Sequence, residues 1–257
     1  MSHTFKVYHF GGQCPWLWWT LEQVQQAALQ LHGSVEVFDV GDKPELASKY
    51  RLFFPFMIII DDRIRWPSPI SAESLISLIQ NTDTPAVMPA APVPPPATAS
   101  QIVAITADNI DAACAFCMPA AEDRLKLAKQ EWGKQYGEAI LGYLAYEAEV
   151  LVGGIEYLRA SRVPFPLPDR RSTTALITCL YSTEDARDYR AQILAYALSR
   201  LPDQGYQAVQ VIAGQREAYP NGPATLFAAK GFHVVEILDR VVLREGEDTL
   251  ILMECVF

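Results

Sequence analysis

Apolar positions in the first eighty residues change repeatedly between a period of two and a period near 3.6. Leu21, Val24 and Ala28 fall three or four residues apart, which predicts a helix that buries one face. Shorter alternating runs on either side predict strands. The expected strands are 5–10, 35–40, 57–60 and 64–66, and the expected helices are 18–31, 44–50 and 71–80, the last capped by Ser71.

A proline-rich segment separates this pattern from a second one. Its prolines lie at positions 85, 89, 92, 94, 95 and 96. Proline lacks an amide donor and fixes φ, so we expect an extended, semi-rigid spacer here. The chain is therefore expected to hold two domains, residues 1–80 and 101–257, joined by a linker at 81–100.

Beyond the linker, strand-like runs outnumber helical ones, which predicts an α+β sheet. The expected strands are 101–106, 139–147, 149–158, 174–181, 207–213, 232–242 and 249–256, and the expected helices are 108–117, 121–136, 183–201 and 224–230. Ala148-Glu149 leaves room only for a tight turn, so its flanking strands should form a hairpin. Thr106 or Asp108 is expected to cap the first of the four helices.

Charge and composition narrow the classes of function. The formal net charge is −9, which argues against nucleic-acid binding and gives no attraction to anionic membranes. The first ten residues alternate like a strand and lack the basic and apolar regions of a secretory signal. Five cysteines in 257 residues do not suggest a disulfide framework. We therefore expect a cytoplasmic protein.

The first eighty residues resemble a thioredoxin-like domain. The resemblance rests on the βαβαββα order, on Cys14 before the first long helix and on Pro55 before the third strand. Leu17 stands where the second cysteine of a Cys-x-x-Cys motif would be, so dithiol exchange is not expected. Two interpretations stay open: a monothiol site at Cys14, or a module used for packing or recognition.

Residues 151–157 (LVGGIEY), 175–181 (ALITCLY) and 221–232 are similar to segments of the GNAT superfamily of N-acetyltransferases. The first resembles the family's vGfieY strand, and the second resembles its fourth strand. Residues 221–232 resemble its Asn-x-x-Ala-x-x-x-Tyr-x-x-x-Gly-Phe motif, with Ala228 near the place of the tyrosine. Glu156-Tyr157 and the Ile-x-Cys of the fourth strand also resemble a YoaP-like subgroup, in which the thioredoxin-like module lies at the other end of the chain.

The resemblance implies an acyl-CoA N-acyltransferase fold after the linker and acetyl-CoA as the cofactor. The acetyl group would pass to an amine on a small molecule or a protein, and a homodimer is compatible with this reading. Main-chain groups of the fourth strand would bind the pantetheine arm and the acyl oxygen. This assigns cofactor contacts to Thr178, Cys179, Leu180 and Tyr181, with Asn221 further along the chain.

The turn expected to hold the cofactor's diphosphate departs from the family pattern. Residues 182–204 contain no glycine, although glycine lets a backbone approach phosphate closely. Arg187, Arg190, Ala191 and Gln192 are the candidate contacts, and Glu184, Asp185 and Asp188 would repel a phosphate. Alternatively, Ser182 or Thr183 caps a helix whose dipole Glu184 and Asp185 favour.

The catalytic candidates are four, because the usual proton-donating tyrosine is missing. They are Glu156, Cys179, Tyr181 and Tyr219. Glu156 could act as a base through water or could be held in an ion pair; the other three could donate a proton or could simply pack. Cys114-x-x-Cys117 is expected to be buried, since no second pair has metal-site spacing. A non-catalytic GNAT-like binding module remains the alternative.

Overall fold

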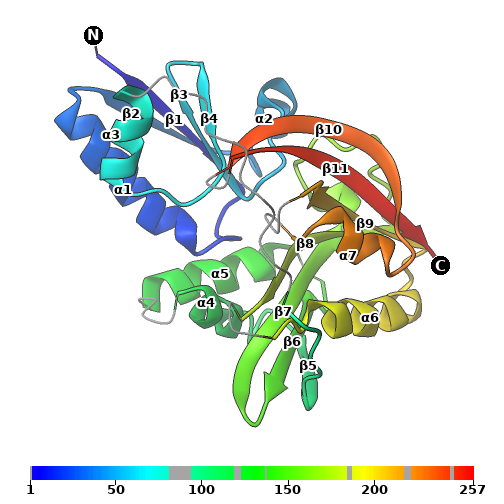
Figure 1. Cartoon of the computed structure of the whole chain (residues 1–257). Helices are drawn as coiled ribbons and strands as arrows, with labels where there is room; N and C mark the ends of the chain where they lie inside the picture. Colours follow the sequence, from blue (N-terminus) through cyan, green and yellow to red (C-terminus); the bar gives the residue numbers. More distant parts are fainter. Residues whose placement is uncertain are drawn as a thin grey trace.

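The computed structural model describes residues 2–80, 94–118, 123–136, 138–183, 187–216, 221–243 and 246–257. We call 2–80 the N-terminal unit and the remaining residues the C-terminal unit. Figure 1 shows the N-terminal unit above helices α4 and α5, with strands β10 and β11 beside it. Among the described residues, no helix combines the length and apolar character needed to cross a membrane.

A four-stranded mixed sheet of order β2-β1-β3-β4 forms the N-terminal unit. Its strands are β1 (Thr4–His9), β2 (Ser34–Asp39), β3 (Phe56–Ile60) and β4 (Ile64–Trp66), and its helices are α1 (Trp16–Gln30), α2 (Pro44–Tyr50) and α3 (Ala72–Gln80). Strand β1 runs parallel to β2 and antiparallel to β3. The predicted elements are confirmed within two residues, and the Ser71 hydroxyl accepts the amide of Ser74 as expected of an N-cap.

A seven-stranded sheet of order β10-β11-β9-β8-β7-β6-β5 forms the C-terminal unit. Its strands are β5 (Gln101–Ile105), β6 (Gly142–Glu147), β7 (Val150–Arg159), β8 (Thr174–Ser182), β9 (Ala208–Gly214), β10 (His233–Leu243) and β11 (Gly246–Val256). Its helices are α4 (Asp111–Cys117), α5 (Asp123–Tyr136), α6 (Arg190–Arg200) and α7 (Ala224–Ala228). The β6–β7 hairpin is confirmed, with positive φ at both Ala148 and Glu149.

Two helix starts differ from the sequence-based expectation. Helix α6 begins at Arg190, not residue 183, because β8 continues to Ser182 and Asp188 pairs with the linker backbone at Pro95 and Ala97. Ser182 and Thr183 therefore do not cap this helix. Helix α4 begins at Asp111, and neither Thr106 nor Asp108 caps it.

One hydrophobic core joins the two units. It contains Phe10, Phe54 and Met57 from the N-terminal unit and Trp132 and Phe165 from the C-terminal unit. The Phe10 ring meets Trp132, Tyr136 and Phe165 edge-on, at centroid distances of 5.6, 5.6 and 6.0 Å. A second core lies on the opposite face of the large sheet, under α6 and α7. The N-terminal unit thus covers one face of the sheet.

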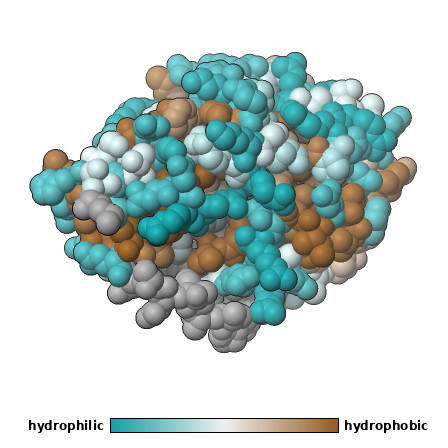
Figure 2. All heavy atoms as spheres, turned by 90° about the horizontal axis from the view of Figure 1, so that it is seen from above, coloured by the Kyte–Doolittle hydropathy of each residue, from teal (hydrophilic) through white to brown (hydrophobic). Residues whose placement is uncertain are grey.

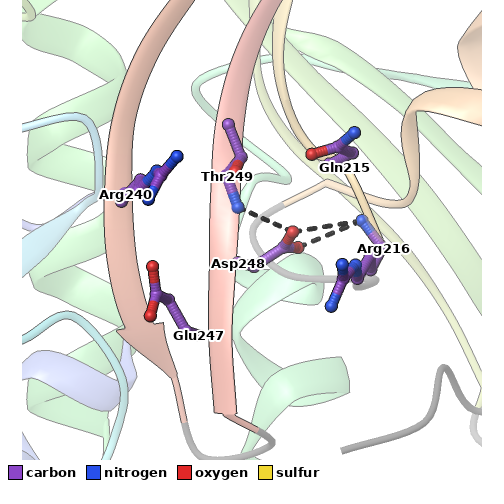
Figure 3. A pocket seen from close by; sticks show the side chains of 6 residues that line it. All are labelled: Gln215, Arg216, Arg240, Glu247, Asp248 and Thr249. Carbon is purple, nitrogen blue, oxygen red and sulfur yellow. Dashed lines mark hydrogen bonds between the residues drawn. The ribbon is translucent and has the colours of Figure 1, made fainter. Parts of the chain in front are cut away.

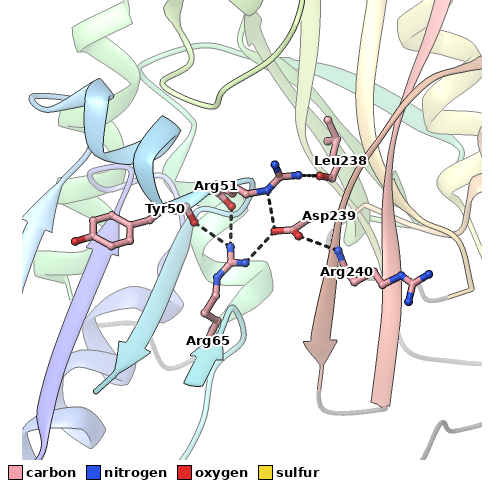
Figure 4. Close-up of polar contacts among 6 residues, drawn as sticks. All are labelled: Tyr50, Arg51, Arg65, Leu238, Asp239 and Arg240. Atoms are coloured by element: carbon pink, nitrogen blue, oxygen red, sulfur yellow. Dashed lines mark hydrogen bonds and ion pairs between the residues drawn. The ribbon is translucent and has the colours of Figure 1, made fainter. Parts of the chain in front are cut away.

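Polar contacts fix the N-terminal unit to β10 (Figure 4). Arg65 donates to Asp239 at 2.9 Å and to the carbonyls of Tyr50 and Arg51, while Arg51 donates to the Leu238 carbonyl. Asp239 is therefore approached by two guanidinium groups from the other unit.

The face of the molecule seen from above carries separate apolar areas, with polar residues between them (Figure 2).

The shared core predicts that both units unfold together. Phe10→Ala should lower the free energy of unfolding by about 3–5 kcal/mol, because it empties a site between the units. Leu29→Ala is the matched control, since Leu29 is 78% exposed on α1. Urea denaturation followed by circular dichroism and tryptophan fluorescence should give one transition in both variants. Two separate transitions in the wild-type protein would contradict the shared core.

Candidate functional site

A wedge opens between β8 and β9, the two adjacent parallel strands of the large sheet. They pair over four residues only, from Thr174–Ala208 to Ile177–Val211. Beyond this point β8 stays paired with β7 as far as Ser182, and β9 stays paired with β11 as far as Gly214. The two strands therefore diverge toward their carboxyl ends. In a parallel sheet such a divergence leaves main-chain groups facing a gap.

A bulge lies at the narrow end of this wedge. The β7–β8 register passes from Tyr157–Ile177 to Glu156–Cys179 and omits Thr178. Past the bulge, the amide of Thr183 donates to the Val152 carbonyl on β7. Since main-chain groups alternate in direction along a strand, those of Leu180 and Ser182 point away from β7, into the wedge. Of the four predicted contacts on β8, Leu180 is thus the one whose main-chain amide faces the gap.

A side chain of the N-terminal unit reaches the same narrow end. Gln13 is buried, and its Nε2 donates to the carbonyl of Thr178 at 3.1 Å. The carbonyl of Gln13 accepts from Lys129 Nζ on α5. Sequence reasoning missed Gln13, since it precedes its partner by 165 residues. The one sequence signal near Gln13 is Cys14, the next residue and a candidate thiol site.

Glu156 is held in a buried ion pair. Its Oε2 lies 2.7 Å from Lys129 Nζ, and both side chains are less than 5% exposed. Burial alone would lower the pKa of Lys129, but the Glu156 carboxylate outweighs it and raises that pKa above its ordinary value. The structure thus favours the ion-paired reading of Glu156 over that of a free base.

Cys179 and Tyr181 lie on the face of β8 that the N-terminal unit and α4 cover. Burial raises the pKa of both groups well above their ordinary values, and the nearby Glu156 carboxylate adds to this. The Tyr181 ring packs against Phe116, with a centroid distance of 4.8 Å and an interplanar angle of 38°, and lies against Gly154, where a Cβ would come within 2.5 Å of the Tyr181 hydroxyl. That hydroxyl is buried and has no hydrogen-bond partner among the described residues. Tyr181 therefore stays protonated and able to donate.

Charged pairs lie beyond the end of β8. Arg190 binds Asp188 through two hydrogen bonds, of 2.9 and 3.0 Å, and Arg187 lies 3.0 Å from Glu147 at the end of β6. A Cβ on Gly222 would lie 3.4 Å from Arg190 Nη1, so this guanidinium reaches from α6 toward the loop after β9. Both candidate cations are thus already neutralised by carboxylates.

The other predicted cofactor contacts are mostly committed to protein groups. Gln192 exchanges two hydrogen bonds with the main chain of Ala99, at 2.6 and 3.2 Å. Ala191 lies in the first turn of α6. Asn221 is buried and donates to the Ile212 carbonyl at 2.9 Å, which fixes the end of β9. Tyr219, Glu184 and Asp185 lie outside the described residues.

The cysteines near the wedge carry no sign of an activated thiol. Burial raises the pKa of Cys14 to about 11, although the Trp16 amide and Lys129 oppose this. Burial likewise raises the pKa of Cys117 to about 12. Cys114 is fully buried, as expected, whereas the side chain of Cys117 is only partly buried. No group of three or more histidine, cysteine or acidic side chains in the described part of the chain could hold a metal ion.

A separate pocket of about 320 Å³ lies at the far end of β9, β10 and β11 (Figure 3). Its lining residues are Gln215, Arg216, Arg240, Glu247, Asp248 and Thr249. Asp248 is buried and accepts the main-chain amides of Arg216 and Thr249, so its charge is partly compensated. The sequence carried no motif for this pocket.

Comparisons with known proteins identify acetyltransferases of similar structure at low identity. A ribosomal-protein-alanine N-acetyltransferase from Brucella melitensis is 14% identical, with a TM-score of 0.46 over 61% of this chain and 99% of that one. A GNAT-family acetyltransferase from Streptococcus pneumoniae is 12% identical, with a TM-score of 0.45 over 61% and 98%. A Bacillus subtilis acetyltransferase in complex with CoA is 14% identical, with a TM-score of 0.39 over 61% and 97%. No family model and no curated protein matches the chain.

The buried ion pair predicts that the stability losses caused by the two single substitutions are not additive in the double variant. Lys129→Met should lower the free energy of unfolding by about 3–5 kcal/mol, because it leaves the Glu156 carboxylate buried and unpaired. Lys129→Met combined with Glu156→Gln should cost less than the sum of the single changes. Denaturant titration of all four proteins measures this coupling.

The same pair fixes the sign of a pH effect. Folding raises the pKa of Lys129, so the charged lysine stabilises the folded protein. This contribution to the free energy of unfolding is fully present below the ordinary lysine pKa, and it is lost as the pH rises through the raised pKa of the folded state. The stability difference between wild type and Lys129→Met should therefore be constant near neutrality and shrink at strongly alkaline pH. A difference that grows with alkalinity would refute the pairing.

The raised pKa of Cys14 predicts that its thiol reacts slowly with alkylating reagents. With a pKa of about 11, its thiolate fraction near neutral pH should be about 100-fold below that of an ordinary cysteine. Alkylation by iodoacetamide, followed by peptide mass spectrometry, measures the rate. A thiol introduced by Leu29→Cys gives the exposed reference. Equal rates at the two positions would restore the monothiol hypothesis.

Proposed function

We propose that this protein is an N-acyltransferase that uses acetyl-CoA and passes the acetyl group to an amine. The observation that carries the proposal is the wedge: a parallel pair that stops after four residues and leaves the Leu180 and Ser182 main-chain groups facing a gap. An extended pantetheine arm is itself a peptide-like chain, so it can pair with such a strand edge. The strand order and the sequence motifs of residues 151–157, 175–181 and 221–232 support the same fold family.

The narrow end of the wedge suits the reacting thioester. The diphosphate of the cofactor would lie toward α6, which follows the end of β8, so the acyl end would lie deepest, near Thr178 and Leu180. Acetyl-CoA supplies an activated acyl group there. The Leu180 amide, which points away from β7, would stabilise negative charge that develops on the acyl oxygen.

Proton transfer falls to groups on the covered face of the sheet. Glu156 is tied to Lys129 and is not assigned the role of base, so the amine would have to arrive neutral or lose its proton to solvent. We assign proton donation to Tyr181 because its hydroxyl is buried, protonated and unpartnered in the described residues. The hydroxyl lies over Gly154 of β7, so the side chain would have to turn toward the wedge to reach the thioester. Tyr157, the neighbour of Glu156, turns to the other face and packs in the core under α6.

The diphosphate end fits the cofactor less completely. Arg190 already donates to Asp188, so it can bind a phosphate only if it gives up this ion pair. The Asp188 carboxylate would also repel the phosphate. This is the observation that favours the second candidate function, a GNAT-like binding or regulatory protein without turnover. Acetyl-CoA binding with and without acetyl transfer separates the two.

We infer that the N-terminal unit is a thioredoxin-like module that works as a scaffold. The parallel β1–α1–β2 unit, the antiparallel β3–β4 hairpin and the position of Cys14 before α1 support this. Pro55 lies beside the same loop, with its carbonyl accepting the Phe10 amide at 2.8 Å. Cross-strand pairing of Glu156 with Cys179 is in keeping with the YoaP-like motif. A cytoplasmic location remains our proposal.

Isothermal titration calorimetry with acetyl-CoA tests the proposal. The wild-type protein should bind acetyl-CoA, and Asp188→Asn should bind it several-fold more tightly, because it frees Arg190 and removes a repelling charge. Arg190→Gln should bind more weakly. A control, Asp203→Asn, removes a carboxylate from the turn after α6 and should leave the affinity unchanged. If the wild type does not bind acetyl-CoA at millimolar concentration, the acyltransferase proposal is wrong.

A further inference from the structure

The narrow end of the wedge contains a side chain from the other structural unit. Thr178 is the first residue of β8 beyond the last β8–β9 pair, and its carbonyl accepts a hydrogen bond from Gln13 Nε2 rather than from β9. The Gln13 carboxamide thus lies where the parallel ladder stops. Any group bound at the deep end of the wedge would meet it.

The loop that carries Gln13 is tightly fixed against α5. A Cβ on Gly12 would lie 2.4 Å from the Ala128 carbonyl oxygen, so only glycine allows this approach. Lys129 binds the Gln13 carbonyl and is itself anchored by Glu156. The position of the Gln13 side chain is therefore set by three elements of the C-terminal unit: α5, β7 and β8.

Two buried polar atoms at this place lack partners. Gln13 Oε1 and Thr178 Oγ1 have no hydrogen-bond partner among the described residues, and both residues are at least 95% buried. A buried acceptor without a donor costs about 1–3 kcal/mol, so such atoms mark places where a bound molecule completes the hydrogen bonding. Gln13 Oε1 is a carbonyl oxygen and can only accept a hydrogen bond, and the bond from Nε2 to the Thr178 carbonyl fixes which end of the carboxamide is the oxygen.

We propose that the N-terminal unit contributes Gln13 to the acyl-transfer site, where Nε2 positions the Thr178 carbonyl and Oε1 accepts an N–H of the acceptor amine. This rests on the proposed function. A neutral primary amine suits the site: one N–H binds Gln13 while the nitrogen lone pair faces the thioester. The N-terminal unit is then a working part of the site.

Affinity labelling tests where residue 13 lies. Bromoacetyl-CoA places an electrophilic carbon at the acyl end of the cofactor. In Gln13→Cys the introduced thiol would release its proton to solvent, and the resulting thiolate would displace bromide and form a carbon–sulfur bond. Peptide mass spectrometry should find this adduct at position 13, at least tenfold slower when excess acetyl-CoA is present. The matched control, Leu29→Cys, should react without protection.

The outcomes separate the two proposals. If the wild type binds acetyl-CoA by calorimetry but position 13 is not labelled, or is labelled without protection, the placement of Gln13 is wrong while the acyltransferase proposal stands. If the wild type does not bind acetyl-CoA, both fall. If Gln13→Ala binds acetyl-CoA and the wild type does not, both proposals are again wrong for the wild-type protein, and Gln13 blocks the wedge.

A kinetic comparison tests the contact with the amine. Gln13→Leu keeps the size of the side chain and removes both hydrogen bonds. It should raise KM for primary alkylamine probes about tenfold and change the acetyl-CoA Kd less than twofold. Gln13→Glu retains an acceptor and should recover part of the KM. Thermal unfolding of each variant checks that the units remain packed. Equal changes in the acetyl-CoA Kd and the amine KM would indicate a structural role only.

Discussion

The candidate site depends on how early the pairing between two parallel strands stops. Strands β8 and β9 pair over four residues only. Beyond them, β8 stays paired with β7 and β9 stays paired with β11. The Thr178 bulge lies at the turning point, and bulges commonly mark places where a strand must bend. Packing on both faces of the sheet, with the N-terminal unit on one and α6 and α7 on the other, supports this divergence.

The two ends of the wedge differ in their electrostatics. At the narrow end, hydrogen-bonding groups are buried, partly unpartnered and fixed by the Lys129–Glu156 pair. Beyond the end of β8, Arg187 and Arg190 are each paired with a carboxylate, so neither of these two cations is free for a diphosphate. Under the proposed function, the Asp188 carboxylate would therefore weaken the binding of acetyl-CoA.

Local sequence signals predicted most elements but not the contacts between them. The 44–50 helix and the Ala148-Glu149 turn are governed by residues within a few positions, and both are confirmed. The predicted start of α6 was wrong because the main chain of Asp188 pairs with the distant linker backbone. Lys129 with Glu156 and Gln13 with Thr178 are 27 and 165 residues apart, so no periodicity could reveal them. The site depended on a family resemblance, which gave the strand but not Gln13.

Hydrogen exchange at the wedge gives the most direct test of the account. Exchange of main-chain amides, resolved by mass spectrometry, should be compared with and without saturating acetyl-CoA. The account predicts slower exchange at Leu180 and Ser182, because the cofactor would pair with the edge of β8 that β9 leaves open. Protection confined to the Arg216–Asp248 pocket, or no change along β8, would contradict it.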